Sequence, residues 1–526
     1  MEAASDEERP LIPHLPSQDE EGSLYTSDGT VDVNNQPALK RTTGNWRACF
    51  LILGTEFVEC FVFFGVAKNL VTFLTGELHE SNVDAAKSVS TWIGTCFFTP
   101  VIGAFLADTY WGKYWTLVIF LSIYTIGMLT LTISASLPLL MDTPHNNGIR
   151  HFTVYLGLYL VALGEGGIKP CTSALGADQF DDADPVEKVT KASFFNWYKK
   201  LEGSPLKRVT QVMVAAVRNY NLGLPEDCSA LHEVPSPTGP NCKIQHTPQF
   251  RLFDKAAIVA TSSDEKGVEV SKNPWRLCTV SQVEELKMLL RMFPVWASMV
   301  LFFTVTAQMS STFIEQGAMM DTRVGPLSVP PASLATFDVI SVMVCIPVYD
   351  AVLVPLARRA TGKDRGLSQR QRLGVGLALS VVAMVYAALV EARRLSLARS
   401  AAAGQPPMMS IMWQAPAFAV LGAGEVFTAI GILEFFYDQS PGGMKSLGTA
   451  LAQLTIAAGN YLNSAVLGAV AALTARGGKP GWIPDDLNEG HLDYFFWLMA
   501  ALGVVNLLHF VHCSMRYRGN NNNTAL

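Results

Sequence analysis

Charged residues are scarce in this chain of 526 residues, since Asp, Glu, Lys and Arg together make up only 16% of it. A soluble protein of this size carries about 25%. Apolar residues make up 49% of the chain, and the mean hydropathy is +0.25. The shortage of charge argues against an ordinary soluble protein and indicates a membrane protein.

Paired cysteines are also lacking. The nine cysteines are scattered, their number is odd, and no CxxC spacing occurs, so neither a disulfide framework nor a metal site is indicated. The sequence contains no nucleophile–base pair, no phosphate-binding loop and no basic patch with interleaved aromatic residues. We therefore expect neither an enzyme nor a nucleic-acid-binding protein, and no cofactor.

Long apolar runs are abundant instead. A helix that crosses the hydrocarbon core of a bilayer needs ~20 mostly apolar residues. Ten stretches meet this rule, and they cover residues 47–74, 89–108, 115–137, 152–175, 287–309, 332–356, 371–391, 411–437, 446–473 and 492–514. These runs are too long for the strands of a membrane barrel. The sequence predicts an all-α polytopic membrane protein.

Positive residues in the short loops predict the orientation of the helices. Lys113 follows the second span, six Lys and Arg residues lie between Arg358 and Arg372, and Arg516 follows the last span. All three places lie on one side of the membrane if both termini are cytoplasmic, which is the orientation we predict. The loop that contains Arg393 disagrees with this pattern.

Polar segments divide the chain into five parts. Residues 1–44 are acidic and poor in apolar residues, which predicts a disordered cytoplasmic tail. Residues 45–175 are expected to form an N-terminal membrane bundle of four helices, and residues 176–286 a cytoplasmic linker. A C-terminal bundle of six helices is expected over residues 287–515, followed by a cytoplasmic tail over residues 516–526.

Two motifs are typical of a known transporter architecture. Gly103, Asp108, Gly112 and Lys113 lie between the second and third spans in the pattern G-x-x-x-x-D-x-x-x-G-K, which fits the loop motif of the major facilitator superfamily. The stretch Ala162-Leu-Gly-Glu-Gly-Gly-Ile-Lys-Pro-Cys-Thr-Ser-Ala-Leu-Gly-Ala-Asp-Gln-Phe, together with Phe-Phe-Asn-Trp197, resembles the signature of the proton-dependent oligopeptide transporter family.

The resemblance extends from about residue 44 to residue 518 and is strongest to the plant nitrate and peptide transporter branch, in particular to its di- and tripeptide transporters. Further matches are Asn273-Pro-Trp-Arg, Glu315-Gln-Gly, Leu433-Glu-Phe-Phe-Tyr and Gly481-Trp-Ile-Pro. The resemblance implies a major facilitator fold and secondary active, proton-coupled uptake of short peptides by alternating access. The implied partners are a small-molecule substrate, protons and the lipid bilayer.

The resemblance also assigns roles to particular residues. Lys169 is expected to bind the peptide carboxylate and Glu425 the peptide amino group, although a helix–helix ion pair at Lys169 and a buried, paired acid at Glu425 stay open as alternatives. Glu56 and Glu59 lie three residues apart, hence on one helical face, and are expected to couple transport to protons. Lys68, about two and a half turns after Glu59, is a further candidate substrate-binding residue.

The chain departs from the family at two places. The family pattern E-x-x-E-R ends here in Cys60, so a fixed positive charge is missing, and Phe63 and Phe64 replace two tyrosines. After Trp197 the family continues into its fifth and sixth helices, whereas this chain continues directly to Gly203-Ser-Pro-Leu. We therefore expect ten transmembrane helices where the family has twelve.

These departures leave two alternatives to peptide transport open. One alternative is a transporter of another small solute, such as nitrate or a hormone-like compound. The other is a transport-inactive splice form that acts as a receptor or regulatory partner. The localisation is open as well. Glu7, Leu11 and Ile12 form an acidic dileucine sorting pattern, which suits the vacuolar membrane, and the plasma membrane is the other possibility.

Overall fold

The computed structural model describes residues 45–140, 147–177, 205–223, 231–232, 246–258, 273, 275–361, 367–400, 409–440, 445–476 and 480–516. The predicted acidic tail, with Glu7, Leu11 and Ile12, lies outside the described residues. So do the larger part of the predicted linker and all but the first residue of the predicted C-terminal tail.

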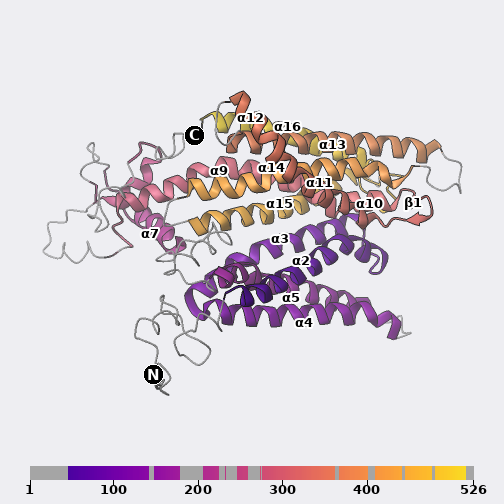
Figure 1. Cartoon of the computed structure of the whole chain (residues 1–526), viewed down its shortest axis with the longest axis horizontal. Helices are drawn as coiled ribbons and strands as arrows, with labels where there is room; N and C mark the ends of the chain where they lie inside the picture. Colours follow the sequence, from indigo (N-terminus) through magenta and orange to yellow (C-terminus); the bar gives the residue numbers. More distant parts are fainter. Residues whose placement is uncertain are drawn as a thin grey trace, which may run out of the picture. The chain divides into compact units, whose positions relative to one another are not determined.

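The first four predicted spans all fall on long helices (Figure 1). These helices are α2 (Asn45–Gly76), α3 (Asn82–Leu106), α4 (Gly112–Leu140) and α5 (Asn147–Ala177). A π-helical turn, η1 (Ala107–Trp111), joins α3 to α4. Helix α3 begins where the Ser81 side chain accepts a hydrogen bond from the backbone N–H of Asp84, which satisfies one of the free donors at the helix start.

The six remaining predicted spans are helical too. They correspond to α9 (Val280–Thr306), α11 (Ala335–Val348) with its continuation η7 (Tyr349–Leu353) and α12 (Val354–Thr361), α13 (Gln369–Ser400), α14 (Ala415–Gln439), α15 (Lys445–Thr474) and α16 (Leu492–Arg516). The shorter elements are α7 (Pro205–Arg218), η4 (Arg251–Ala257), η5 (Ala307–Ser310), α10 (Thr312–Ala318), η6 (Pro331–Leu334), η8 (Ile411–Gln414) and a hairpin of β1 (Arg323–Val324) and β2 (Leu327–Ser328).

Eight stretches of the described chain are long and apolar enough to cross a membrane, and one of them, Asn82–Ser136, contains both α3 and most of α4. Helix α5 is not among these stretches, because Glu165, Lys169 and several glycines lower its mean hydropathy. The charged residues of α5 are therefore the feature that separates it from an ordinary apolar membrane helix.

The contacts within the chain define two compact units. Unit 1 contains the described residues 45–61 of α2 and 169–177 of α5. Unit 2 contains residues 62–168 and all described residues from 205 onward. The predicted boundaries of a four-helix bundle, a linker and a six-helix bundle stay a prediction.

Within unit 2, α13 packs against α14 and α16, and α15 packs against both α3 and α9. A buried aromatic cluster forms where Phe313 contacts the rings of Phe418 and Phe496 edge-on, each with a centroid separation of 5.4 Å. Aromatic pairs in this geometry contribute about 0.5–1.5 kcal/mol beyond the burial of their surface.

A buried chain of amide and hydroxyl groups links α3, η5 and α15 in unit 2. The Gln308 Nε2 donates to Asn463 Oδ1 over 2.6 Å, and the Asn463 Nδ2 donates to Ser90 Oγ over 2.9 Å. The hydroxyl of Thr312 donates to Gln308 Oε1 over 2.8 Å. Because unpaired polar groups are costly when buried, this network favours one arrangement of α3 against α15.

The predicted loop motif has a structural role at both of its glycines. A Cβ atom on Gly103 would lie 1.9 Å from the backbone oxygen of Gly166, so two glycines allow α3 and α5 to approach closely. Gly112 has a φ of 71°, in the left-handed region that favours glycine, at the sharp turn between η1 and α4. The backbone therefore accounts for Gly103 and Gly112.

The described part of the predicted linker packs onto the start of α9. The fully buried ammonium of Lys287 lies 2.6 Å from Asp254 Oδ1 on η4 and 2.8 Å from Glu284 Oε1. Nearby, burial raises the pKa of the Cys278 thiol to about 11, so this thiol is protonated at neutral pH. These contacts attach η4 and its surroundings to the first turns of α9.

Candidate functional site

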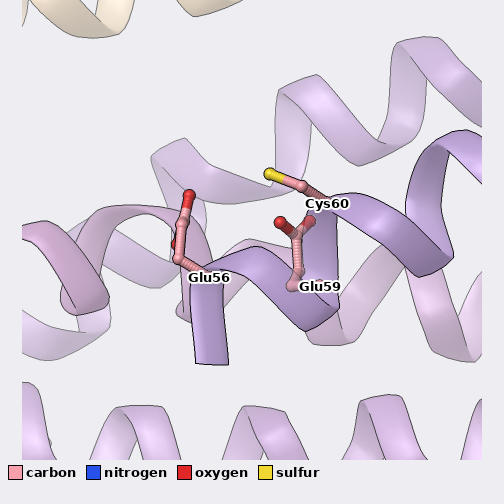
Figure 2. A group of neighbouring side chains, drawn as sticks. All are labelled: Glu56, Glu59 and Cys60. Atoms are coloured by element: carbon pink, nitrogen blue, oxygen red, sulfur yellow. The ribbon is translucent and has the colours of Figure 1, made fainter. Parts of the chain in front are cut away.

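Two acids and a thiol form a cluster on α2 in unit 1. Glu56, Glu59 and Cys60 stand at positions i, i+3 and i+4, which lie on the same helical face. One ligand-type atom from each of them lies within 4.8 Å of the others. Figure 2 shows the two carboxyl groups and the sulfur beside one another on this turn of the helix. The predicted pairing of Glu56 and Glu59 is thus a close one.

Glu59 is the most buried member of this cluster, with 3% of its surface exposed. The Lys169 ammonium, from α5, lies 3.8 Å from Glu59 Oε1. The Cys60 thiol is a further partner of Glu59, whereas Glu56 Oε2 accepts no hydrogen bond from a described residue. The structure therefore brings Lys169 into an ion pair with Glu59, which is the alternative to a direct substrate contact that the sequence left open.

A second group of charges lies in unit 2. The Lys68 ammonium, on α2, donates a 3.0 Å hydrogen bond to the Ser310 hydroxyl of η5. Lys68 also interacts electrostatically with Asp338 on α11 and with Glu425 on α14. Lys68 and Glu425, two of the predicted substrate-binding residues, thus lie within range of electrostatic interaction with each other.

Asp338 and Ser310 belong to this group but are absent from the sequence prediction. Asp338 is an acid in an apolar stretch, which is a signal of functional residues in membrane helices, but the sequence does not show that it faces Lys68. A Cβ atom on Gly422 would lie 2.6 Å from Asp338 Oδ1, so this glycine lets α14 approach the carboxylate. Ser310 could not be predicted as a functional residue, because a lone hydroxyl in a membrane helix usually donates a hydrogen bond to a backbone carbonyl of the same helix.

Of the loop-motif residues, Gly103 and Gly112 act through the backbone as described above, and Lys113 is half-buried at the start of α4. The side chain of Asp108 lies outside the described part of the structure, so its predicted bracing of a helix end stays a prediction.

The chain is similar to known proteins along almost all of its length. Residues 114–199 and 198–483 match the model of the POT family. The chain belongs to the POT family. It is 45% identical to the Arabidopsis thaliana protein NRT1/PTR FAMILY 8.3, over 98% of this chain and 99% of the relative. It is 46% identical to NRT1/PTR FAMILY 8.5 of the same plant, over 92% of each chain.

The fold of this POT family member is also found among solved structures. It matches the crystal structure of an auto-inhibited POT family peptide transporter with a TM-score of 0.60 and 23% identity, over 90% of this chain and 97% of the other. The predicted all-α polytopic membrane fold of the major facilitator type is thereby confirmed. The chain is a membrane transporter by family and not an enzyme, as predicted.

The position at which two helices are predicted to be absent coincides with a break in the family match. The two matched pieces meet at residues 198 and 199, directly after Trp197, where the sequence departs from the family. The alignment with NRT1/PTR FAMILY 8.3 is 588 positions long, more than the 526 residues of this chain. The relative therefore has residues for which this chain has no counterpart, in agreement with the predicted shortening.

Proposed function

We propose that this POT family member takes up di- and tripeptides together with protons by alternating access. The observation that carries the proposal is the group in unit 2, where the Lys68 ammonium interacts with the carboxylates of Asp338 and Glu425. A short peptide is a zwitterion, so it needs an acid for its amino group and a base for its carboxylate. A site that contains both charges in a membrane interior suits such a substrate.

The contacts of Lys68 suggest how a peptide would bind. A peptide ammonium that enters beside Glu425 would take the place of Lys68 as the partner of that acid. Lys68, on a long and flexible side chain, would then be free to bind the peptide carboxylate. The exchange replaces one set of opposite charges by another, so no buried charge is left without a partner.

We also propose that Lys169 acts as a carboxylate-binding residue and that Glu56 and Glu59 couple transport to protons. This part rests on the family pattern at these positions, supported by the 3.8 Å distance between Lys169 and Glu59. While Lys169 pairs with Glu59, it is not available to a substrate. Loss of that pair would remove one partner of Lys169, which links the state of the acids to substrate binding.

One observation favours transport of a different small solute. Phe63 and Phe64 stand where the family has tyrosines, and Phe63 is buried, with its ring stacked on Trp92 at a centroid separation of 5.6 Å. No hydroxyl is available at either position to bind a peptide backbone. A less polar substrate, such as a hormone-like compound, would lose less from this change than a peptide.

Ligand binding to the purified full chain distinguishes peptide transport from transport of a different small solute. A ligand that binds only the folded protein raises its stability, by about 2.7 kcal/mol at a concentration of one hundred times Kd. We expect a dipeptide to raise the thermal unfolding midpoint, and its N-acetylated form, which lacks the ammonium, to raise it much less. Equal shifts with both peptides, or a shift with nitrate alone, would contradict the proposed charge recognition.

The localisation is proposed as either the plasma membrane or the vacuolar membrane. Family membership supports an integral membrane protein, and the apolar helices agree with it. The choice of membrane depends on the sorting pattern at Glu7, Leu11 and Ile12, which lies outside the described residues.

A further inference from the structure

A groove of about 460 Å³ lies on unit 2, between the end of α13 and the start of α14. Its lining is aliphatic or aromatic apart from one charged residue, Arg393, which is exposed. The other lining residues include Tyr386, Leu389, Leu397, Met409 and Trp413. The Tyr386 hydroxyl donates a 3.0 Å hydrogen bond to the backbone oxygen of Trp413, which links the two walls. The groove thus combines apolar walls with a single cation.

Three arginines near the end of α13 lie on the side of the membrane opposite to the predicted cytoplasmic one, where loops contain less Lys and Arg. Two of them bind within the protein. Arg394 lies 2.7 Å from Glu391 Oε1. Arg399 donates a 3.2 Å hydrogen bond to the Gly490 carbonyl. Arg393 forms no hydrogen bond or ion pair with any described residue, so the unexplained positive charge of this loop reduces to the arginine in the groove.

The surface of α13 that leads to Arg393 is apolar. Val375, Val382 and Leu389 are exposed and stand two helical turns apart, so they form one stripe along the helix. At a rise of 1.5 Å per residue, the stripe is about 21 Å long and ends about 6 Å before Arg393. Arg393 follows the predicted apolar span over residues 371–391, which places it at the membrane surface. Tryptophans such as Trp413 are enriched at the same level.

We propose that the groove binds an anionic phospholipid, with the phosphate beside Arg393 and an acyl chain along the exposed stripe of α13. A guanidinium group binds phosphate through two parallel hydrogen bonds. Half of the hydrocarbon core is ~15 Å thick, so the stripe is long enough for the acyl chain of one leaflet. A soluble phosphate would leave the apolar walls of the groove without a partner. A zwitterionic lipid has its own cation next to the phosphate, which weakens its attraction to Arg393.

Lipid binding to the full chain tests the proposal without any transport. The chain is purified in a neutral detergent, and native mass spectrometry counts the lipids that it retains when phosphatidylglycerol or phosphatidylcholine with the same acyl chains is added. We expect one phosphatidylglycerol to bind more tightly than phosphatidylcholine. Arg393→Gln should weaken this binding at least about fivefold, the effect of one basic residue at an anionic membrane surface. The matched control Arg323→Gln removes an exposed arginine of β1, on the same predicted side, and should leave binding unchanged.

A second measurement locates the lipid and needs no change at Arg393. Phosphatidylglycerol with brominated acyl chains, added at one molecule per chain, should quench part of the tryptophan fluorescence. That part should be absent from Trp413→Phe and retained in Trp497→Phe, which changes an exposed tryptophan of α16. Equal affinity for the two lipids, equal losses in Arg393→Gln and Arg323→Gln, or quenching that persists in Trp413→Phe would overturn the proposal. Displacement of the lipid by inorganic phosphate would overturn it too, because the groove would then be a site for a soluble anion.

Discussion

Replacement of Lys68 by methionine is expected to lower peptide uptake at least about tenfold. Lys68 is the cation that faces Asp338 and Glu425 in unit 2, and its removal would leave two acids in a medium of low dielectric constant. A hydrogen bond to a charged group contributes about 1.5–3 kcal/mol, and Lys68→Met removes the one that we propose Lys68 makes to the peptide carboxylate. A tenfold change in rate corresponds to about 1.4 kcal/mol, so loss of this single interaction is sufficient. The measurement is initial uptake of a labelled dipeptide, corrected for the amount of protein at the surface.

Two further variants separate charge from packing at this position. Lys68→Arg keeps the positive charge and should retain more activity than Lys68→Met. Lys68→Met combined with Asp338→Asn removes one charge of each sign and should recover part of the folding yield that the single variant loses. Lys87→Met is the matched control, because Lys87 pairs with Asp84 at an exposed end of α3. Equal uptake by Lys68→Met and Lys87→Met would contradict the proposed site.

Insertion of the two helices that are predicted to be absent is expected to raise uptake at least about tenfold, which corresponds to about 1.4 kcal/mol. The inserted segment is the corresponding part of NRT1/PTR FAMILY 8.3, placed between Tyr198 and Lys199, where the two pieces of the family match meet. Helix α2 exposes large apolar side chains, among them Phe57 at 73% and Phe61 at 74%. Two additional helices offer protein surface for such faces and close the N-terminal half around its acids.

The chimera also tests whether the short chain is complete as a transporter. The expected result is a higher thermal unfolding midpoint together with faster uptake per molecule. An insertion of two unrelated apolar helices of equal length is the control, since it restores the length without the family's contacts. If the short chain and the chimera transport at the same rate, ten helices suffice and the shortening has no functional cost.

The helices of this protein could be predicted from the sequence because their signal is simple. Each predicted span needed only about twenty apolar residues, and each is a helix in the structure. Helix α3 begins seven residues before its predicted span, at Asn82, because the polar turn at Ser81 and Asp84 forms a cap that an apolar window does not detect. Windows of hydropathy locate helices well and their ends poorly.

The candidate site could be predicted only in part. The roles of Glu56, Glu59, Lys68, Lys169 and Glu425 were predicted from the resemblance to the family, and the position of Lys169 in an apolar span supported its role. Their partners were not predicted, because the hydrogen bond of Lys68 to Ser310 and its electrostatic interaction with Asp338 join residues more than two hundred positions apart. The pairing of Lys169 with Glu59 likewise depends on the packing of two helices. Tertiary contacts of this kind leave no periodic trace in one sequence.

Uptake of a labelled dipeptide at acid and neutral pH, by cells that lack their own peptide transporter, tests the central claim most directly. The short chain and the chimera are compared after surface expression of both is confirmed. The account predicts saturable uptake by the short chain that is faster at acid pH, and that excess unlabelled dipeptide inhibits but N-acetylated dipeptide does not. Uptake by the chimera alone, with none by the short chain at equal surface level, would contradict it.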